Sequence, residues 1–373
     1  MFVTALAALL LGLAQPPTVR VWDDQLASNL TPAQVRFVAT HEAGAQKLPR
    51  TQIAALKRIN PKFRVLQYRL AIGLGRHTQV LDGDRWVNEW PAHPQEQWFT
   101  HVAGHRELMQ QWGWYLTNPD NPAWQHFFTA QLKRQIAHTG AWGAFLDSAS
   151  VPNEFGGSAW QPPLHDFEPP FEHAWSKKLE RWLPYVQRRI GKPVVANVGS
   201  WVTTRDVTDY SHIAGVMLEG WATNLAPLDW RLEQQRAWSL ARRGRIVIAQ
   251  SYPQNAQERM FDVASLLLVQ GAQTYVNLQS SQQAEWWPEY DVALGAPTGV
   301  ATYGSVATRA FQHGRVFVNP GDTAQTVNVT GRLADPHGGG LVDGNGVTDA
   351  TVATHPVSSF VLAPRSAAFV YTP

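Results

Sequence analysis

Two acidic residues stand at the ends of apolar runs where an ionised carboxylate would be costly to bury. Asp147 ends the run 144–147 (AFLD), and Glu219 ends the run 216–219 (VMLE). A buried carboxylate needs partners or a specific role. Hydrolysis of a glycosidic bond uses two carboxyl groups, one as acid and one as nucleophile or base. The pair therefore predicts a glycosidase, against the alternatives that one residue caps a helix or pairs with Arg69.

Other polar side chains at predicted strand ends are candidates for substrate binding. Because side chains alternate along a strand, only one of His41 and Glu42 can face the site, and the same holds for Tyr68 and Arg69. His41 either binds substrate or forms local hydrogen bonds in the core. Uncharged donors and acceptors of the kind that bind sugar hydroxyls end the later strands. These candidates are Asn197, Gln250, Tyr252, Asn277 and Gln279.

Tryptophan is abundant and unevenly distributed. All 17 tryptophans lie between Trp22 and Trp287. The flat face and N–H donor of tryptophan suit it to stacking on sugar rings, although tryptophan also fills large cores. The candidates for sugar stacking are Trp86, Trp90, Trp201 and Trp221.

The elements that must position these residues repeat one theme, in which a short apolar run is followed by a helical stretch. Helical spacing or caps mark 51–59, 123–139, 174–190, 229–243 and 255–270. Eight runs are predicted strands: 36–42, 64–70, 112–117, 142–147, 193–198, 213–219, 245–251 and 273–279. This alternation predicts an α/β fold, a (β/α)8 TIM barrel, whose strands bring their carboxyl ends to one site.

The chain divides into three predicted parts. Residues 1–15 form an apolar run typical of a secretory signal peptide with cleavage near Ala14, and residues 16–307 form the barrel. Residues 308–373 contain short strand-like runs between Gly, Pro, Asn and Asp, which predict a small antiparallel β-sandwich domain. Within the barrel, we expect 71–111 to lie over its mouth and 150–173 to influence specificity.

Composition excludes several other classes. The net charge is +2 and the basic residues are scattered, which argues against nucleic-acid binding. The chain has no cysteine, so disulfides and thiol catalysis are excluded. Motifs for zinc peptidases, phosphate-binding loops, serine hydrolases and dinucleotide binding are absent, and we expect no metal or cofactor. The run 1–15 is shorter than the about 20 residues that span a bilayer, so we expect a secreted, periplasmic or cell-surface protein without stable membrane insertion.

Several segments resemble glycoside hydrolases of the type grouped as hypothetical glycosyl hydrolase family 15. More distantly, the chain is similar to family-114 polygalactosaminidases and to retaining α-glycosidase barrels. The matching segments are VATHEAGAQKL (38–48), VLQYRLAIG (65–73), WYLTN (114–118), AFLDSAS (144–150), ANVGSW (196–201) and GVMLEGW (215–221). The resemblance implies a nucleophile and an acid/base on strands four and six, which correspond to Asp147 and Glu219. A trailing β-domain is also common in such enzymes.

These observations predict a hydrolase that cleaves an O-glycosidic bond in an extracellular or cell-surface glycan, with a polysaccharide or oligosaccharide as substrate. The expected mechanism is retaining: Asp147 attacks the anomeric carbon or stabilises the oxocarbenium-like transition state, while Glu219 protonates the leaving oxygen and then activates water. Two alternatives stay open. One is a catalytically silent barrel that binds carbohydrate, and the other is an envelope scaffold protein whose β-domain makes the contacts.

Overall fold

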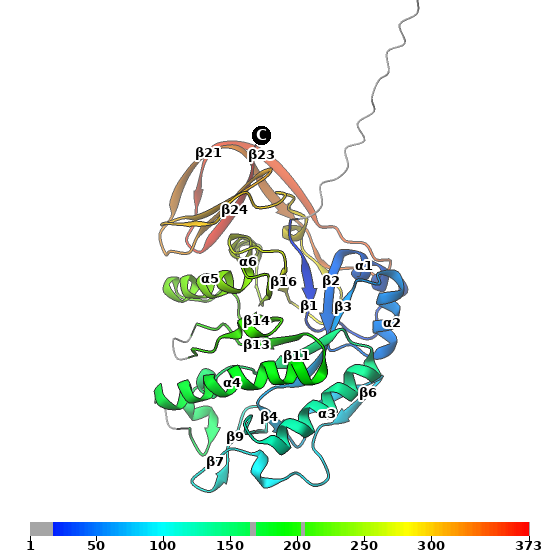
Figure 1. Cartoon of the computed structure of the whole chain (residues 1–373). Helices are drawn as coiled ribbons and strands as arrows, with labels where there is room; N and C mark the ends of the chain where they lie inside the picture. The colour runs from blue at the N-terminus through cyan, green and yellow to red at the C-terminus, as the bar shows by residue number, and fades with distance from the viewer. Residues whose placement is uncertain (1–17, 165–168, 203–205, 373) are drawn as a thin grey trace, which may run out of the picture.

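A closed barrel of eight parallel strands forms the centre of the computed structural model, which describes residues 18–164, 169–202 and 206–372 (Figure 1). In barrel order from the first strand of the chain, the strands are β1 (Val21–Asp23), β2 (Glu42–Gln46), β3 (Arg64–Leu70), β11 (Gly143–Asp147), β13 (Val194–Asn197), β14 (Gly215–Glu219), β15 (Ile246–Ser251) and β16 (Thr274–Leu278). Pairing of β1 with β16 closes the ring. The predicted (β/α)8 barrel is confirmed.

Helices cover the outside of the barrel (Figure 1). They are α1 (Pro32–His41), α2 (Arg50–Ile59), α3 (Pro122–Thr139), α4 (Pro169–Ile190), α5 (Pro227–Ala241) and α6 (Ala256–Leu268). Local sequence sets their ends: Asn121 caps α3 by accepting from Trp124 N, and Gly140 ends it in the left-handed conformation. Helix α3 packs on β3 and β11, and Phe128 and Leu132 are among its buried residues.

Large apolar side chains fill the inside of the barrel. Along β3 and β11 they alternate with residues that face the helices, as the geometry of a strand requires. This inner cluster consists of Trp22, Leu66, Phe145, Val195, Met217, Ile246, Ile248 and Tyr275. The barrel is therefore a packed core, and polar chemistry is restricted to its ends.

Two of the predicted barrel strands are wrong. The segment 36–42 is mostly helix α1, which begins with a capping box in which Thr31 accepts from Gln34 N and the Gln34 side chain accepts from Thr31 N. The segment 112–117 contributes only β10 (Trp114–Leu116), which belongs to a small sheet outside the barrel in the order β12-β9-β10-β4. The true first and second strands are β1 and β2, so 64–70 is the third strand. Asp147 and Glu219 nevertheless end strands four and six.

The long segment between β3 and α3 forms short strands and one turn of 3-10 helix. These are β4 (Gly73–Gly75), β5 (Gln79–Asp82), β6 (Arg85–Asn88), η1 (Glu96–Trp98), β7 (His101–Val102), β8 (His105–Arg106) and β9 (Leu108–Met109), followed by β10. After β11, the chain forms η2 (Pro152–Phe155), η3 (Gly157–Ala159) and β12 (Trp160–Gln161), and η4 (Tyr210–His212) precedes β14. Strand β12 pairs with β9, so the segment 71–111, predicted to lie over the barrel mouth, contacts the segment 150–173, predicted to influence specificity.

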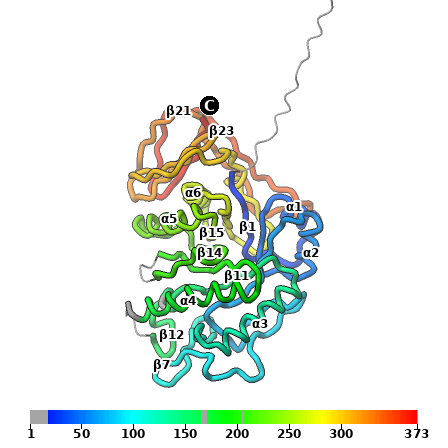
Figure 2. Tube along the Cα trace, in the orientation of Figure 1, coloured from blue at the N-terminus to red at the C-terminus, as the bar shows by residue number. Residues whose placement is uncertain are grey.

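The C-terminal part lies beside α6 (Figure 2) and forms one six-stranded sheet in the order β18-β19-β20-β24-β21-β23, so the expected antiparallel sheet structure is confirmed. Its strands are β18 (Thr302–Tyr303), β19 (Ala307–Phe311), β20 (Gly314–Asn319), β21 (Gln325–His337), β23 (Thr351–Leu362) and β24 (Ser366–Tyr371). The sheet packs on α6. A separate antiparallel pair joins β17 (Glu285–Trp286) to β22 (Gly340–Leu341), and η5 (Pro288–Asp291) follows β17 in the chain.

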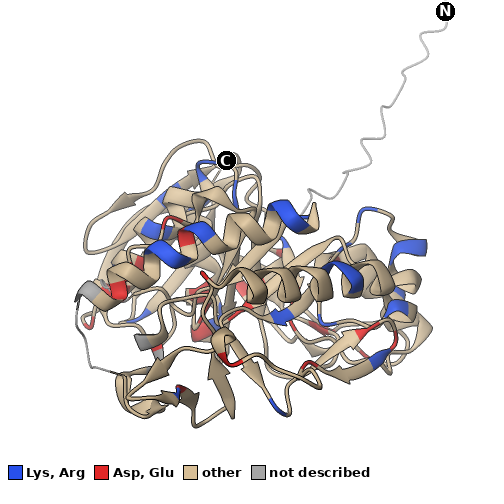
Figure 3. Ribbon diagram, turned by 60° about the horizontal axis from the view of Figure 1, so that its bottom comes forward, with Lys and Arg blue, Asp and Glu red and all other residues tan. Residues whose placement is uncertain are grey.

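The predicted signal peptide, residues 1–15, lies outside the described residues. Among the helices of the described ranges, none has the length and apolar character needed to cross a membrane. Lys and Arg residues are spread over several helices and loops (Figure 3), in agreement with their scattered positions in the sequence.

Candidate active site

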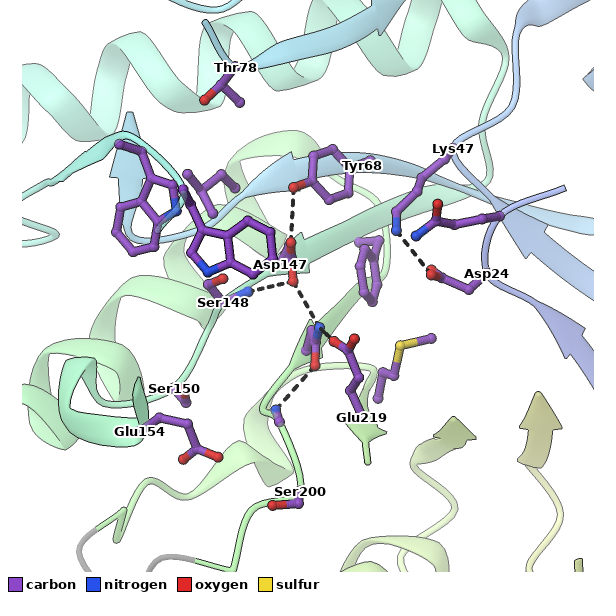
Figure 4. A pocket seen from close by; sticks show the side chains of 18 of the residues that line it. Asp24, Lys47, Tyr68, Thr78, Asp147, Ser148, Ser150, Glu154, Ser200 and Glu219 are labelled. Atoms are coloured by element: carbon purple, nitrogen blue, oxygen red, sulfur yellow. Dashed lines mark hydrogen bonds and ion pairs between the residues drawn. The ribbon is translucent and has the colours of Figure 1, made fainter. Parts of the chain in front are cut away.

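A cavity of about 700 Å³ opens at the carboxyl ends of the barrel strands (Figure 4). Most of the strands and the loops after them contribute to its wall. The lining residues are Asp24, Gln25, Lys47, Tyr68, Leu70, Thr78, Trp86, Trp112, Trp114, Phe145, Asp147, Ser148, Ser150, Glu154, Asn197, Gly199, Ser200, Met217 and Glu219. Both predicted catalytic carboxyl groups therefore lie in one cavity.

Asp147 accepts three hydrogen bonds at the end of β11. Tyr68 Oη donates to Oδ2 at 2.9 Å, whereas Asn197 Nδ2 and Ser148 N each donate to Oδ1 at 2.8 Å. Burial and the charge of Asp147 raise the pKa of Tyr68 well above its usual value, so its hydroxyl stays protonated as a donor. Ser148 itself adopts a positive φ of 52°, which is uncommon for a residue other than glycine. These donors fix the orientation of Asp147.

Asn197 connects the two carboxyl groups. Its Nδ2 also donates to Glu219 Oε2 at 2.6 Å, and its Oδ1 accepts from Gly199 N at 3.1 Å, which settles the orientation of the amide. Both hydrogen bonds, of 2.8 and 2.6 Å, come from the same nitrogen. The accepting oxygens of Asp147 and Glu219 therefore lie at most about 5.4 Å apart.

Glu219 is held from its other side by the strand that follows. Tyr252 Oη donates to Glu219 Oε1 at 2.6 Å, and Gln250 Nε2 donates to Tyr252 Oη at 2.8 Å and to Gln279 Oε1 at 3.1 Å. Burial, followed by the charge of Glu219, raises the pKa of Tyr252 above its usual range. Gln250, Tyr252 and Gln279 thus act through one hydrogen-bond network that ends on Glu219.

The sequence prediction missed a second polar group in the cavity, Asp24 with Lys47. Lys47 Nζ lies 3.0 Å from Asp24 Oδ2 and 5.2 Å from the centre of the Tyr68 ring. Gln46 Nε2 donates to Asp24 Oδ1. Both residues directly follow true barrel strands, β1 and β2. The sequence prediction took candidates from the ends of predicted strands. It missed these two residues because it placed the first strand at 36–42.

Among the predicted binding residues, His41, Glu42 and Arg69 lie away from the cavity. His41 ends helix α1, where its ring stacks on Phe37 at 4.0 Å. Glu42 is buried at the amino end of β2, opposite the cavity, and burial raises its pKa. Arg69 faces the helices and forms a buried ion pair of 2.9 Å with Glu89. Because Arg69 points outward, it does not contact Asp147; its neighbour Tyr68 does.

The tryptophans that line the cavity differ from most of those expected. Trp221 is fully buried and donates to Asp262 O, and Trp201 is buried edge-on against Tyr210. Trp90 packs on Phe99 and is not among the lining residues. Of the four predicted, Trp86 lines the cavity.

Two unpredicted tryptophans, Trp112 and Trp114, line the cavity as well. Trp86 and Trp112 are 55% and 61% exposed, which makes their ring faces available to a ligand. Asn277 is buried beside Gln250 in the barrel wall and is not a lining residue.

Two carboxyl groups this close together in the mouth of a (β/α)8 barrel are the arrangement that glycoside hydrolases use. Residues 57–315, which include both carboxyl groups and Asn197, match the model of hypothetical glycosyl hydrolase family 15. The chain belongs to this family, as the sequence resemblance predicted, and is a glycoside hydrolase.

Structural comparison finds distant similarity to amylase-type barrels. A maltogenic α-amylase from Thermotoga neapolitana shares 9% sequence identity, with a TM-score of 0.47, 94% of this chain covered and 98% of that chain. A cycloisomaltooligosaccharide glucanotransferase from Paenibacillus sp. shares 11% identity, with a TM-score of 0.37, 95% of this chain covered and 55% of that chain. Comparison with curated protein sequences gave no match.

Proposed function

We propose that the protein hydrolyses an O-glycosidic bond in an extracellular oligosaccharide or polysaccharide by a retaining mechanism. The observation that carries the proposal is the shared donor, Asn197 Nδ2, between Asp147 and Glu219. Retaining enzymes place their carboxyl groups about 5–5.5 Å apart, whereas inverting enzymes leave about 6.5–9.5 Å for a water molecule. The upper limit of about 5.4 Å on the distance between the bonded oxygens supports the retaining arrangement.

In the first step, an oxygen of Asp147 attacks the anomeric carbon while the bond from this carbon to the leaving oxygen breaks. Glu219 transfers its proton to the leaving oxygen, and a glycosyl ester of Asp147 remains. In the second step, Glu219 takes a proton from water, the water oxygen attacks the anomeric carbon, and the carboxylate of Asp147 is released. Tyr68 and Asn197 keep Asp147 in place during both steps, and Tyr252 does the same for Glu219.

The exposed tryptophans favour a substrate longer than one sugar unit. Trp86 comes from the β5–β6 hairpin and Trp112 from the turn before β10, and both contribute to the cavity wall. Exposed tryptophan is unusual on a protein surface without a partner, and its ring face suits an apolar sugar face. An extracellular substrate is favoured by the apolar run at residues 1–15.

The test is release of reducing sugar from a broad panel that includes α-linked glucans and galactosamine-containing polymers. Wild type should release sugar, Asp147→Asn should not, and Asp120→Asn should behave as wild type because the Asp120 carboxylate pairs with Arg181 and is not among the lining residues of the cavity. Proton NMR of the first product should show the anomer of the substrate bond. The inverted anomer would overturn the retaining mechanism, and wild-type turnover by Asp147→Asn would show that the pair is misassigned.

The same panel tests the silent binding barrel. Such a protein would bind sugar equally well with and without Asp147 and would release no product from any polymer. Binding can be followed by tryptophan fluorescence, because Trp86 and Trp112 line the cavity.

A further inference from the structure

Glu154 is a third carboxyl group in the cavity wall, and the proposed reaction does not use it. It lies on η2, in the loop that follows Asp147. Figure 4 shows its side chain on the same side of the cavity as Ser150 and Ser200, away from Asp24 and Lys47. This part of the wall is therefore polar and lies next to the two reacting carboxyl groups.

One oxygen of Glu154 lacks a partner. Among the described residues, no group hydrogen-bonds the buried Oε2 atom. A buried acceptor without a partner costs about 1–3 kcal/mol, and because Glu154 lines the cavity, a sugar hydroxyl that reached this oxygen would recover that cost.

The other oxygen fits closely against the backbone of Gly199. Gly199 has a φ of +61°, and a Cβ atom there would lie 2.5 Å from Glu154 Oε1. A residue without a side chain is thus required at this position, both for the backbone conformation and for the space that Glu154 occupies. Since Gly199 N also donates to Asn197 Oδ1, the position of Glu154 is tied to that of the catalytic pair.

The charges around Glu154 favour its neutral form. Burial, followed by the charge of Asp206, raises its pKa to about 8, and Arg236 opposes this shift in part. Tyr210 also faces this group, but it donates to Asp206 and to the backbone. At neutral pH Glu154 is therefore mainly a carboxylic acid, which offers one donor and several acceptor sites. A neutral acid matches a sugar hydroxyl, which also donates and accepts.

We propose that Glu154 is a specificity-determining residue that hydrogen-bonds a hydroxyl group of a neutral sugar unit bound beside Asp147. The enzyme should consequently reject sugars that lack this hydroxyl, because Glu154 would then stay buried without a partner. This inference rests on the proposed glycosidase function. It adds a binding residue to that site and leaves the two reaction steps unchanged.

The test compares Glu154→Leu and Glu154→Gln with wild type on p-nitrophenyl α- and β-glycosides of glucose, galactose and mannose and on their monodeoxy analogues. Glu154→Leu should raise KM about 10- to 100-fold with kcat nearly unchanged, since it removes binding common to ground and transition states. Glu154→Gln keeps a donor and an acceptor, so KM should stay within about threefold of wild type near pH 7. With wild type, one monodeoxy analogue should show the same fold increase in KM as Glu154→Leu shows with the parent sugar. When Glu154→Leu is assayed with that analogue, KM should rise no further.

A matched control is Glu107→Leu, which removes another buried carboxyl group without a partner among the described residues, outside the cavity lining. Because it removes an unpaired buried polar group, it should keep or raise the melting temperature, and it should leave KM unchanged. A second readout is the pH profile: the KM of wild type should rise above about pH 8, where Glu154 ionises and loses its donor, and that of Glu154→Gln should not.

The outcomes separate this inference from the proposed function. If wild type cleaves a glycoside and Glu154→Leu shows the same KM, or loses kcat alone, Glu154 does not bind the sugar as proposed although the glycosidase function stands. If wild type cleaves neither the aryl glycosides nor any polymer of the panel, both proposals fail together. If Glu154→Leu does not fold, its melting curve will show this. The KM values of Glu154→Gln and of the monodeoxy analogues then test whether Glu154 binds the sugar.

Discussion

Replacing Asn197 by alanine removes the donor that Asp147 and Glu219 share. The proposed mechanism keeps one negative charge on the pair, and Asn197 Nδ2 donates to both carboxyl groups, so it stabilises whichever one carries that charge. Each charge-assisted hydrogen bond that is lost is worth about 1.5–3 kcal/mol, although water entering the space replaces part of it. We therefore expect a net loss of about 3 kcal/mol in transition-state stabilisation, or about 100-fold in kcat/KM.

Steady-state kinetics on whichever substrate the panel identifies would measure this loss, with the melting temperature recorded alongside. Asn197→Asp should be worse than Asn197→Ala, because a third carboxylate replaces the donor. The matched control is Asn319→Ala in the C-terminal sheet, where the Asn319 amide donates to Thr323 O and Ala363 O. It should lower stability and leave kcat/KM unchanged. Activity of Asn197→Ala within about threefold of wild type would refute the role of Asn197 as the shared donor.

Three further outcomes are expected from the contacts described above. Tyr252→Phe removes the 2.6 Å hydrogen bond to Glu219 and should lower kcat about tenfold in steady-state assays, with a result equal to wild type contradicting this contact. Trp112→Ala should weaken oligosaccharide binding about 5- to 30-fold by fluorescence or calorimetry while aryl glycosides bind as before; equal losses for both would speak against stacking beyond the first sugar. Burial raises the pKa of Asp262 from 3.8 to about 7, so the folded state holds the proton more tightly and stability falls as pH rises through this range. The melting temperature of Asp262→Asn should accordingly fall less than that of wild type between about pH 5 and pH 8, and parallel curves would contradict the shift.

The fold was predictable where a strand carried its own pattern. The runs at 142–147 and 213–219 are apolar and end in an acidic residue, and the structure places β11 and β14 there. Strand β1 has three residues, which is too short for a periodic signal, and its pairing depends on β2 and β16. The error at 36–42 had a readable local cause, since Thr31-Pro32-Ala33-Gln34 is a helix-capping sequence that outweighs the β-branched residues after it.

The positions of single side chains in the site needed the structure. Val65 and Leu66 are both apolar, so the sequence does not reveal which face of β3 is inside; Leu66 faces the barrel core, and Tyr68 follows it to the site. Acidic residues at strand ends were found because burial makes them conspicuous. Glu154 lies on a turn of 3-10 helix, and only tertiary contacts bring it to the cavity, so no local pattern could have identified it.

The way in which the barrel closes has a consequence for the order of folding during synthesis. Val21 of β1 pairs with Val276 of β16, so the ring cannot close until nearly three quarters of the chain has left the ribosome. Until then, β1 and β15 each present an open edge to neighbouring chains. The loop between β22 and β23 then contacts the start of α1, where Gln34 Nε2 donates to Val342 O and Thr31 Oγ1 donates to Gly344 O. Contacts of such long sequence separation slow folding, so a nascent chain stalled before Leu278 should be exposed to aggregation and depend on chaperones.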